Sequence, residues 1–186
     1  RSDGTLVGWG DNEFGQINLF SGGMDSLIGA IDYLATNDNM KLCLISHYDH
    51  YMKGAKHDQD ELIARFTDKY PDRFYHLPAV HIYPLLSNET TCRSRSLMFL
   101  AIALLVAKHK SVGVVVPENG SVSLNFPLSV SRRAACSTRT THILFINQLK
   151  EILQKMGLNI PINNPYELET KGAMVRNCAD RDYLLD

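Results

Sequence analysis

One short stretch near the N-terminus, residues 21–26 with the sequence SGGMDS, constrains the fold and the chemistry of this chain more than any other. It lies between an apolar run at 17–20 and a helical pattern that starts at Leu27. Glycines let the backbone turn tightly and come close to a ligand. The first amides of the following helix lack intrahelical partners and face whatever occupies the turn. The stretch therefore predicts a strand, a glycine turn and a helix N-terminus that together bind an anion.

An ordinary strand-to-helix turn uses the same residue types, and a turn without a ligand is the alternative. Five fixed positions arise by chance with odds on the order of 10⁻⁴ at average residue usage, which favours a nucleotide phosphate loop. Ser21 and Ser26 add hydroxyl donors, and Asp25 can cap the helix or help to hold a cation that accompanies a polyphosphate. No Lys-Ser or Lys-Thr follows the glycines and no third glycine has the required offset, so Walker A and dinucleotide-binding loops are excluded.

Strand and helix patterns alternate along the rest of the chain, which predicts an α/β fold: a three-layer, doubly wound parallel sheet with helices on both faces. Near-continuous apolar runs are typical of strands covered on both sides. The segment 97–107 is apolar nearly all round and predicts a central, buried helix. The expected strands are 17–20, 41–46, 74–82, 112–116 and 158–162, and the expected helices are 25–36, 58–70, 97–107, 142–156 and 171–180.

Ligands of such sheets bind beyond the carboxyl ends of the strands, so the residues that follow each strand are expected to share one crevice. His47 follows the second strand, where it is either an acid/base or base-stacking residue or a structural neighbour. Glu118 follows the fourth strand. It either recognises an amine or guanidine-like edge of a substrate, helps to hold a metal, or belongs to a simple turn.

Basic residues stand at three further places. Arg95 precedes the most apolar helix, where a cation is unfavourable for the helix dipole, and this favours a phosphate-binding role. The long polar segment 121–141 contains Arg132, Arg133 and Arg139. It is either a solvated or RNA-facing basic loop or a mobile clamp that closes on phosphate and substrate. Lys171 stands at a loop-to-helix junction, from which an ammonium group can reach a polyphosphate.

Composition bounds the class of protein. With 186 residues, 45% hydrophobic and 21% charged, the chain is long and apolar enough for one globular domain. A net charge of −1 argues against stable binding of bulk nucleic acid. Four widely spaced cysteines without a CxxC pair, no signal peptide and no apolar run of membrane-spanning length predict a soluble cytoplasmic protein with no membrane partner.

The sequence is expected to be a fragment of a longer protein, cut at both ends. The chain starts at Arg1 without Met, and residues 1–16 are expected to be a loop or the end of a preceding segment. The expected domain occupies 17–186 and stops directly after a helical pattern.

The order of the later motifs resembles the QueC-like family of PP-loop ATP pyrophosphatases, and most closely the QueC-like relatives (QatC) in the Qat anti-phage system. The resemblance covers roughly 18–178 and is carried by the segments 19–26, 94–100, 117–120, 131–142, 164–166 and 170–172. It implies an adenine nucleotide alpha hydrolase-like (PP-loop/HUP) fold that uses ATP and Mg²⁺. Enzymes of this family split ATP between the α and β phosphates, adenylate a substrate oxygen and release pyrophosphate.

The resemblance also implies residue roles. The nucleotide would be bound by Ser21, Gly22, Gly23, Asp25, Ser26 and His47, with Mg²⁺ on Asp25. The catalytic residues would be Asp25, Ser26, Arg95 and Lys171, and the substrate side would be lined by Glu118, Arg132, Arg133 and Arg139.

Two departures from the housekeeping enzymes of the family matter, and the second, at 117–120, favours the defence branch. Those enzymes carry a structural zinc site of four cysteines near the C-terminus, which this chain lacks, so zinc is expected only in a longer protein. The tract 117–120 also differs. The leading expectation is a QueC-like adenylating enzyme of anti-phage defence, acting on a small molecule or a protein terminus, with other Qat proteins or a second copy as partners. The alternatives are 7-cyano-7-deazaguanine (preQ0) synthase of queuosine biosynthesis, and a non-catalytic nucleotide-binding subunit.

Overall fold

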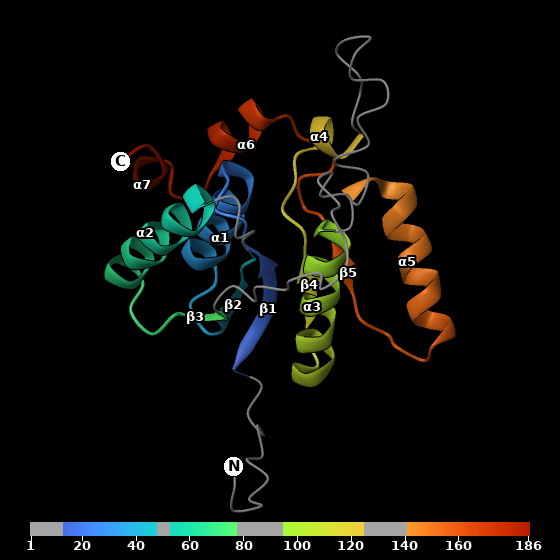
Figure 1. Cartoon of the computed structure of the whole chain (residues 1–186). Coiled ribbons are helices and arrows are strands. Elements are labelled where there is room, and N and C mark those ends of the chain that lie inside the picture. Colours follow the sequence, from blue (N-terminus) through green and yellow to red (C-terminus); the bar gives the residue numbers. More distant parts are fainter. Residues whose placement is uncertain (1–12, 48–52, 78–94, 125–140) are drawn as a thin grey trace, which may run out of the picture.

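The computed structural model describes residues 13–47, 53–77, 95–124 and 141–186, and within them five parallel strands form one sheet (Figure 1). The spatial order is β3-β2-β1-β4-β5. The strands are β1 (Phe14–Leu19), β2 (Lys41–Ile45), β3 (Phe74–Leu77), β4 (Gly113–Val115) and β5 (Ile162–Asn163). The predicted α/β fold with a doubly wound parallel sheet is confirmed.

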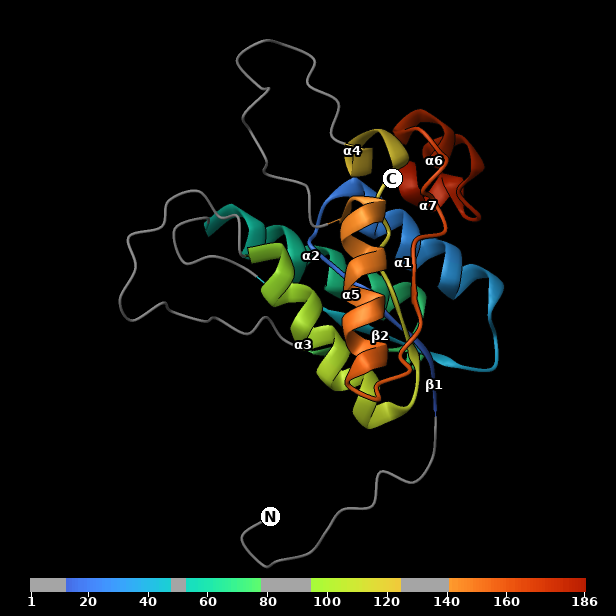
Figure 2. The ribbon, with the colours of Figure 1, turned by 90° about the vertical axis from the view of Figure 1, so that its right-hand side faces the viewer.

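Helices cover both faces of the sheet, which gives three layers (Figures 1 and 2). One face packs against α1 (Met24–Thr36) and α2 (Lys53–Lys69), joined by α6 (Lys171–Asn177) and α7 (Arg181–Leu185). The other face packs against α3 (Arg95–Lys110) and α5 (Ile143–Lys155). The short helix α4 (Gly120–Leu124) follows β4 at the edge where the strands end.

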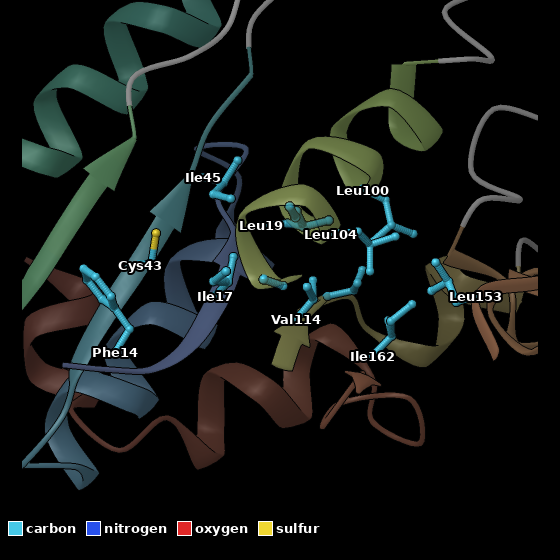
Figure 3. Packing of buried hydrophobic residues seen from close by; sticks show 13 residues of the cluster. Phe14, Ile17, Leu19, Cys43, Ile45, Leu100, Leu104, Val114, Leu153 and Ile162 are labelled. Carbon is cyan, nitrogen blue, oxygen red and sulfur yellow. The ribbon is translucent and has the colours of Figure 1, made fainter. Parts of the chain in front are cut away.

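Side-chain alternation along β2 shows how the two cores are separated. Cys43 and Ile45 belong to the cluster under α3 and α5 (Figure 3), whereas Leu42 and Leu44 belong to the cluster under α1 and α2. All four are fully or almost fully buried. Successive residues of a strand point to opposite faces, so a strand covered on both sides needs an unbroken apolar run.

The middle of α1 lies unusually close to the end of β4. A Cβ atom added at Gly29 would stand 2.5 Å from the Cβ atom of Pro117, so a side chain at this position would force the two elements apart. The Gly29 carbonyl also accepts a hydrogen bond of 3.1 Å from Nδ2 of the buried Asn18 in β1. These contacts fix the spacing between α1, β1 and the segment that follows β4.

The first strand begins earlier than the sequence predicts, because β1 starts at Phe14, inside the segment 1–16 expected to be a loop. Phe14 is buried and pairs with Lys41, and the register shifts between Phe14 and Gln16. Gly15 lies in this irregularity, where a Cβ atom would stand 1.9 Å from the Tyr33 hydroxyl oxygen. The glycine and the bulge interrupt the apolar pattern that would have marked the strand.

The expectation of a central, buried helix at 97–107 is wrong for the outer side of the helix. Leu100 and Leu104 of α3 are buried, but Leu105 is 72% exposed and Leu97 is 43% exposed. The helix lies in an outer layer, so only its inner side contacts the sheet.

Other boundaries differ by a few residues. Helix α2 begins at Lys53, and β5 is displaced from 158–162 to Ile162–Asn163. The predicted residues 78–82 of the third strand lie outside the described ranges. The last predicted helix ends at Asn177 and is followed by the separate helix α7.

Candidate functional site

The loop 21–26 follows β1, which lies where the order of strand addition in the sheet reverses. The chain runs outward from β1 to β2 and β3, and then returns to β4 on the other side of β1. Such a switch point leaves a crevice beyond the carboxyl ends of the two central strands. The loop after β1 and the residues after β4 therefore form its two sides.

The loop has the backbone shape expected of an anion cradle. Gly22 has φ +84°, in the left-handed region that favours glycine, and the extended Gly23 caps α1. The Ser26 hydroxyl donates to the Gly23 carbonyl at 2.8 Å and lies 3.2 Å from the Ser21 hydroxyl. The Gly23 amide donates to the Ser21 hydroxyl oxygen at 3.3 Å. The predicted strand, glycine turn and helix N-terminus are all present.

Asp25 is buried and held from the opposite side of the crevice. Its Oδ2 atom accepts hydrogen bonds from the Asn119 backbone amide at 3.1 Å and from Asn119 Nδ2 at 2.6 Å. Its Oδ1 atom is buried and accepts no hydrogen bond among the described residues; the Lys171 ammonium forms an ion pair with it at 3.2 Å. Three distant segments of the chain thus meet at one carboxylate.

Lys171 reaches the site because the segment before α6 is attached to the end of β4. Asn164 Nδ2 donates to the Glu118 carbonyl at 2.7 Å, and the Gly120 amide donates to the Glu169 carbonyl at 2.8 Å. A Cβ atom added at Gly120 would stand 2.2 Å from the Glu167 carbonyl oxygen, so the two segments are in close contact here. Thr170 caps α6 by accepting a hydrogen bond from the Ala173 amide, so Lys171 is its first residue.

Glu118 carries a strongly perturbed carboxyl group at the same edge. Burial, and next the Asp25 charge, raise the pKa of Glu118 to about 7, while the Lys171 ammonium opposes the shift. A carboxyl group with this pKa can accept or release a proton near neutral pH. It also suits the N–H edge of a ligand, since an acceptor in a half-buried position strengthens such a hydrogen bond.

His47 lies at the end of β2, beside the loop. Gln59 of α2 is buried, and its Nε2 atom donates to the Ser21 carbonyl at 2.9 Å and to the His47 carbonyl at 3.1 Å. The His47 ring lies 6.2 Å from the Phe99 ring of α3, between centroids. The backbone of His47 therefore supports the loop.

The structure brings together the loop residues, Glu118 and Lys171, with His47 alongside. Arg95 is the first residue of α3, and its side chain lies outside the description. Arg132, Arg133 and Arg139 lie outside the described residues and stay predictions. Sequence reasoning assigned no role to Asn119 or Gln59, although both are buried polar residues that contact the loop.

A cavity of about 890 Å³ lies elsewhere, between α1 and α5 beside β4 and β5. Asp32, Ile146, Lys150 and Ile162 contribute to its wall, and none of the loop residues 21–26 does. The residues predicted to bind an anion meet at the strand ends and not in this cavity, so the candidate site is the strand-end crevice.

The described ranges hold neither a cluster of metal ligands nor a membrane-spanning helix. They contain no group of three or more His, Cys, Asp or Glu residues placed to hold a metal ion. Cys43 and Cys178 are free thiols, buried in different core clusters. Across the same ranges, no helix has the length and apolar character needed to cross a bilayer.

Comparison with known proteins supports the fold. No protein-family model matches the chain, and no curated protein matches it in sequence. Among solved structures, the U34-tRNA thiolase NcsA from Methanococcus maripaludis, with its [4Fe-4S] cluster, matches with a TM-score of 0.56 and 17% identity. The match covers 94% of this chain and 59% of the thiolase chain, so the chain spans less than two thirds of that protein. The chain therefore has the PP-loop type of α/β fold.

Proposed function

We propose that this chain is an ATP-dependent adenylating enzyme of the PP-loop type. It binds ATP at the loop 21–26, transfers AMP to an acceptor oxygen and releases pyrophosphate. The observation that carries the proposal is the meeting of this loop with Asp25 and Lys171 at the switch point of the sheet. The likeness to a PP-loop thiolase adds support at the level of the fold.

The residues of the crevice fit a nucleoside triphosphate and its metal ion. Left-handed Gly22 and the N-terminus of α1 suit a phosphate group, and the Ser21 and Ser26 hydroxyls can redirect to it. Asp25 Oδ1 is buried, and the Lys171 ammonium lies 3.2 Å from it, so this oxygen already faces a positive charge, which fits a hard cation at the same place. Asp25 would therefore hold Mg²⁺, which supplies charge neutralisation at the phosphates.

In the proposed reaction, an acceptor oxygen attacks the α-phosphorus of ATP. A bond forms between them, the bond from the α-phosphorus to its bridging oxygen breaks, and the electron pair leaves with pyrophosphate. Positive charge near the leaving group lowers the barrier because it stabilises the charge that develops there. Lys171 is proposed as the cation at the leaving group, supported by its position 3.2 Å from Asp25 Oδ1, and Arg95 is proposed as the second.

Glu118 supports a substrate with an N–H donor edge. Its half-buried carboxyl group is close enough to Asp25 and Lys171 for both charges to affect its raised pKa. An amine or guanidine-like edge would bind there, as on a deazapurine or a protein N-terminus. Arg132, Arg133 and Arg139 are proposed to contact the acceptor from the loop between α4 and α5.

The order of motifs in the sequence supports a finer proposal, a QueC-like enzyme of anti-phage defence. The protein would act in the cytoplasm, with other Qat-system proteins or a second copy as partners, and zinc would be bound by a longer form. In a phage-infection assay of the complete defence system, Asp25→Ala is expected to abolish protection. Full protection by that variant would contradict the defence role.

The test of the adenylating activity is pyrophosphate release from MgATP by the full chain with candidate acceptors. Asp25→Ala and Ser26→Ala are expected to lower the rate by about 100-fold or more, because each removes a group at the phosphates. The matched controls are Asp182→Ala and Thr67→Ala, both at exposed positions outside the candidate site, which should keep the wild-type rate. Unchanged rates in both loop variants would overturn the assignment of the loop.

Two other outcomes identify the alternative functions. Conversion of 7-carboxy-7-deazaguanine to the nitrile would assign the chain to preQ0 synthesis. Binding of MgATP that depends on Asp25, without pyrophosphate release for any acceptor, would assign it as a nucleotide-binding subunit.

A further inference from the structure

Asn119 makes more contacts to the loop 21–26 than a turn residue requires. It is 1% exposed, follows Glu118 at the end of β4, and gives two hydrogen bonds to one oxygen of Asp25. The bond from its side chain, at 2.6 Å, joins two buried groups. A hydrogen bond from a neutral donor to a buried carboxylate is among the stronger kinds in proteins.

The Asn119 amide is held at both ends. Its Oδ1 atom accepts from the Val122 amide at 3.1 Å, which caps α4, so Nδ2 must face Asp25. The orientation of the amide is thus set by the first turn of a helix on the far side of the crevice. Since the same residue also gives its backbone amide to Asp25, the carboxylate is fixed by two donors from one rigid position.

Both donors go to Oδ2, and this leaves Oδ1 turned toward Lys171. The two oxygens of Asp25 therefore have different tasks. One anchors the carboxylate to β4 and α4, and the other faces a cation, which in this structure is the Lys171 ammonium. Rotation of the carboxylate would exchange the two, and the two Asn119 donors oppose that rotation.

We propose that Asn119 is a positioning residue that directs Asp25 Oδ1 toward the metal–nucleotide site. The proposal rests on the proposed function of the loop. Asn119 does not itself contact the phosphates; it acts through Asp25. Loss of a group that orients a metal-binding carboxylate lowers metal affinity or activity by about 10–100-fold in other proteins.

The test uses two variants that keep the cap of α4. Serine and aspartate accept the capping hydrogen bond about as well as asparagine. Asn119→Ser is too short to reach Asp25, and Asn119→Asp places a second carboxylate against it. MgATP affinity, measured by calorimetry on the full chain, is expected to fall by about 10-fold in Asn119→Ser and further in Asn119→Asp. Asn147→Ser on the exposed surface of α5 is the matched control.

A double-mutant cycle separates positioning from general structural support. If Asn119 acts through Asp25, Asn119→Ser should have no further effect on MgATP affinity once Asp25→Ala is present. The unfolding temperatures of Asn119→Ser and wild type should stay within a few degrees. Losses that multiply in the double variant, or wild-type affinity in Asn119→Ser, would overturn the inference.

The outcomes also separate this inference from the proposed function. Wild-type protein that binds MgATP but releases no pyrophosphate would refute adenylation and still leave the cycle on MgATP affinity decisive for Asn119. Wild-type protein that does not bind MgATP would refute both.

Discussion

The two faces of the sheet are packed by different chemistry. The face under α3 and α5 is largely aliphatic, with Leu100, Leu104 and Val114 among its buried side chains (Figure 3). The face under α1 and α2 is rich in aromatic rings. Phe66 is fully buried, and the rings of Phe20, Tyr70, Phe74 and Tyr183 surround it with centroids 5.9–6.3 Å away.

The aromatic face also carries polar contacts that fix the C-terminal segment. Asp32 of α1 accepts from the Tyr166 hydroxyl at 2.6 Å and from the Ala179 amide at 2.7 Å. Lys69 of α2 forms an ion pair of 3.0 Å with Asp180. These contacts hold the chain on both sides of α6. One face therefore mainly supplies stability, and the other supplies stability and the position of Lys171.

The largest expected effect tests this difference directly. Phe66→Ala and Leu104→Ala should each lower the free energy of unfolding, by about 3–5 and about 2–5 kcal/mol, because each leaves a cavity in a core. At a temperature where both variants are folded, only Phe66→Ala should weaken MgATP binding, since Phe66 packs against Phe20, the residue before the loop. Denaturant unfolding and calorimetry measure the two quantities. Equal losses of MgATP affinity in the two variants would show that the two faces of the sheet do not differ in their effect on the site.

Glu118 gives the next effect, through pH. Its folded pKa of about 7 lies above the reference value of 4.5, so the native state binds the proton more tightly. The stability that this proton provides is fully present below about pH 4.5 and is lost as the pH rises through about 7. Relative to Glu118→Gln, wild type should lose up to about 3 kcal/mol across this range. Glu151→Gln at an exposed position of α5 should show no such trend.

Tyr166→Phe should produce a smaller loss. Burial, and next the Asp32 carboxylate, raise the pKa of Tyr166, so its hydroxyl stays protonated and donates to Asp32. Removing the hydroxyl leaves a carboxylate short of one donor, at a cost of about 1–3 kcal/mol. MgATP affinity should fall a few-fold because the segment that leads to Lys171 loosens. Tyr75→Phe, whose ring is 52% exposed, should change neither quantity.

The smallest effect concerns the ion pair of α2 with α7. Asp180→Asn keeps the capping acceptor for the Tyr183 amide and removes the charge that pairs with Lys69. The loss should be about 0.5–1 kcal/mol at low salt and should shrink at high salt. The Lys69 hydrogen bond lowers the pKa of Asp180, so the contribution is present at neutral pH and disappears as the pH falls below about 4. A loss that does not depend on salt would show that the contact acts by packing.

The sequence allowed prediction of the parts whose signals are local. The loop 21–26, the buried strands 41–45 and 113–115, and the convergence of strand ends follow from residue order and periodicity. Lys171 was predicted at the site, and the structure places its ammonium on Asp25. Asn119 and Gln59 could not be assigned, because a buried amide becomes informative only when its partners from other elements are known.

Short elements escaped prediction for a related reason. Helices α4 and α7 have five residues each, too few for a periodic pattern. Tertiary contacts stabilise them: Asn119 caps α4, and Tyr183 of α7 packs on Phe66. The exposed side of α3 was not predicted, because an apolar sequence does not show whether another layer of the protein covers the outer side of the helix.

Gly29 sets the width of the crevice without facing it. Because its missing Cβ lets Pro117 approach α1, the distance from Asp25 to Asn119 is governed by a residue one turn further along the same helix. Alanine there would favour the helix by about 1 kcal/mol and at the same time push the end of β4 away. Position 29 therefore controls the candidate site from a distance: one added methyl group would shift the segment that carries Glu118 and Asn119 relative to Asp25, although position 29 itself makes no contact with Asp25.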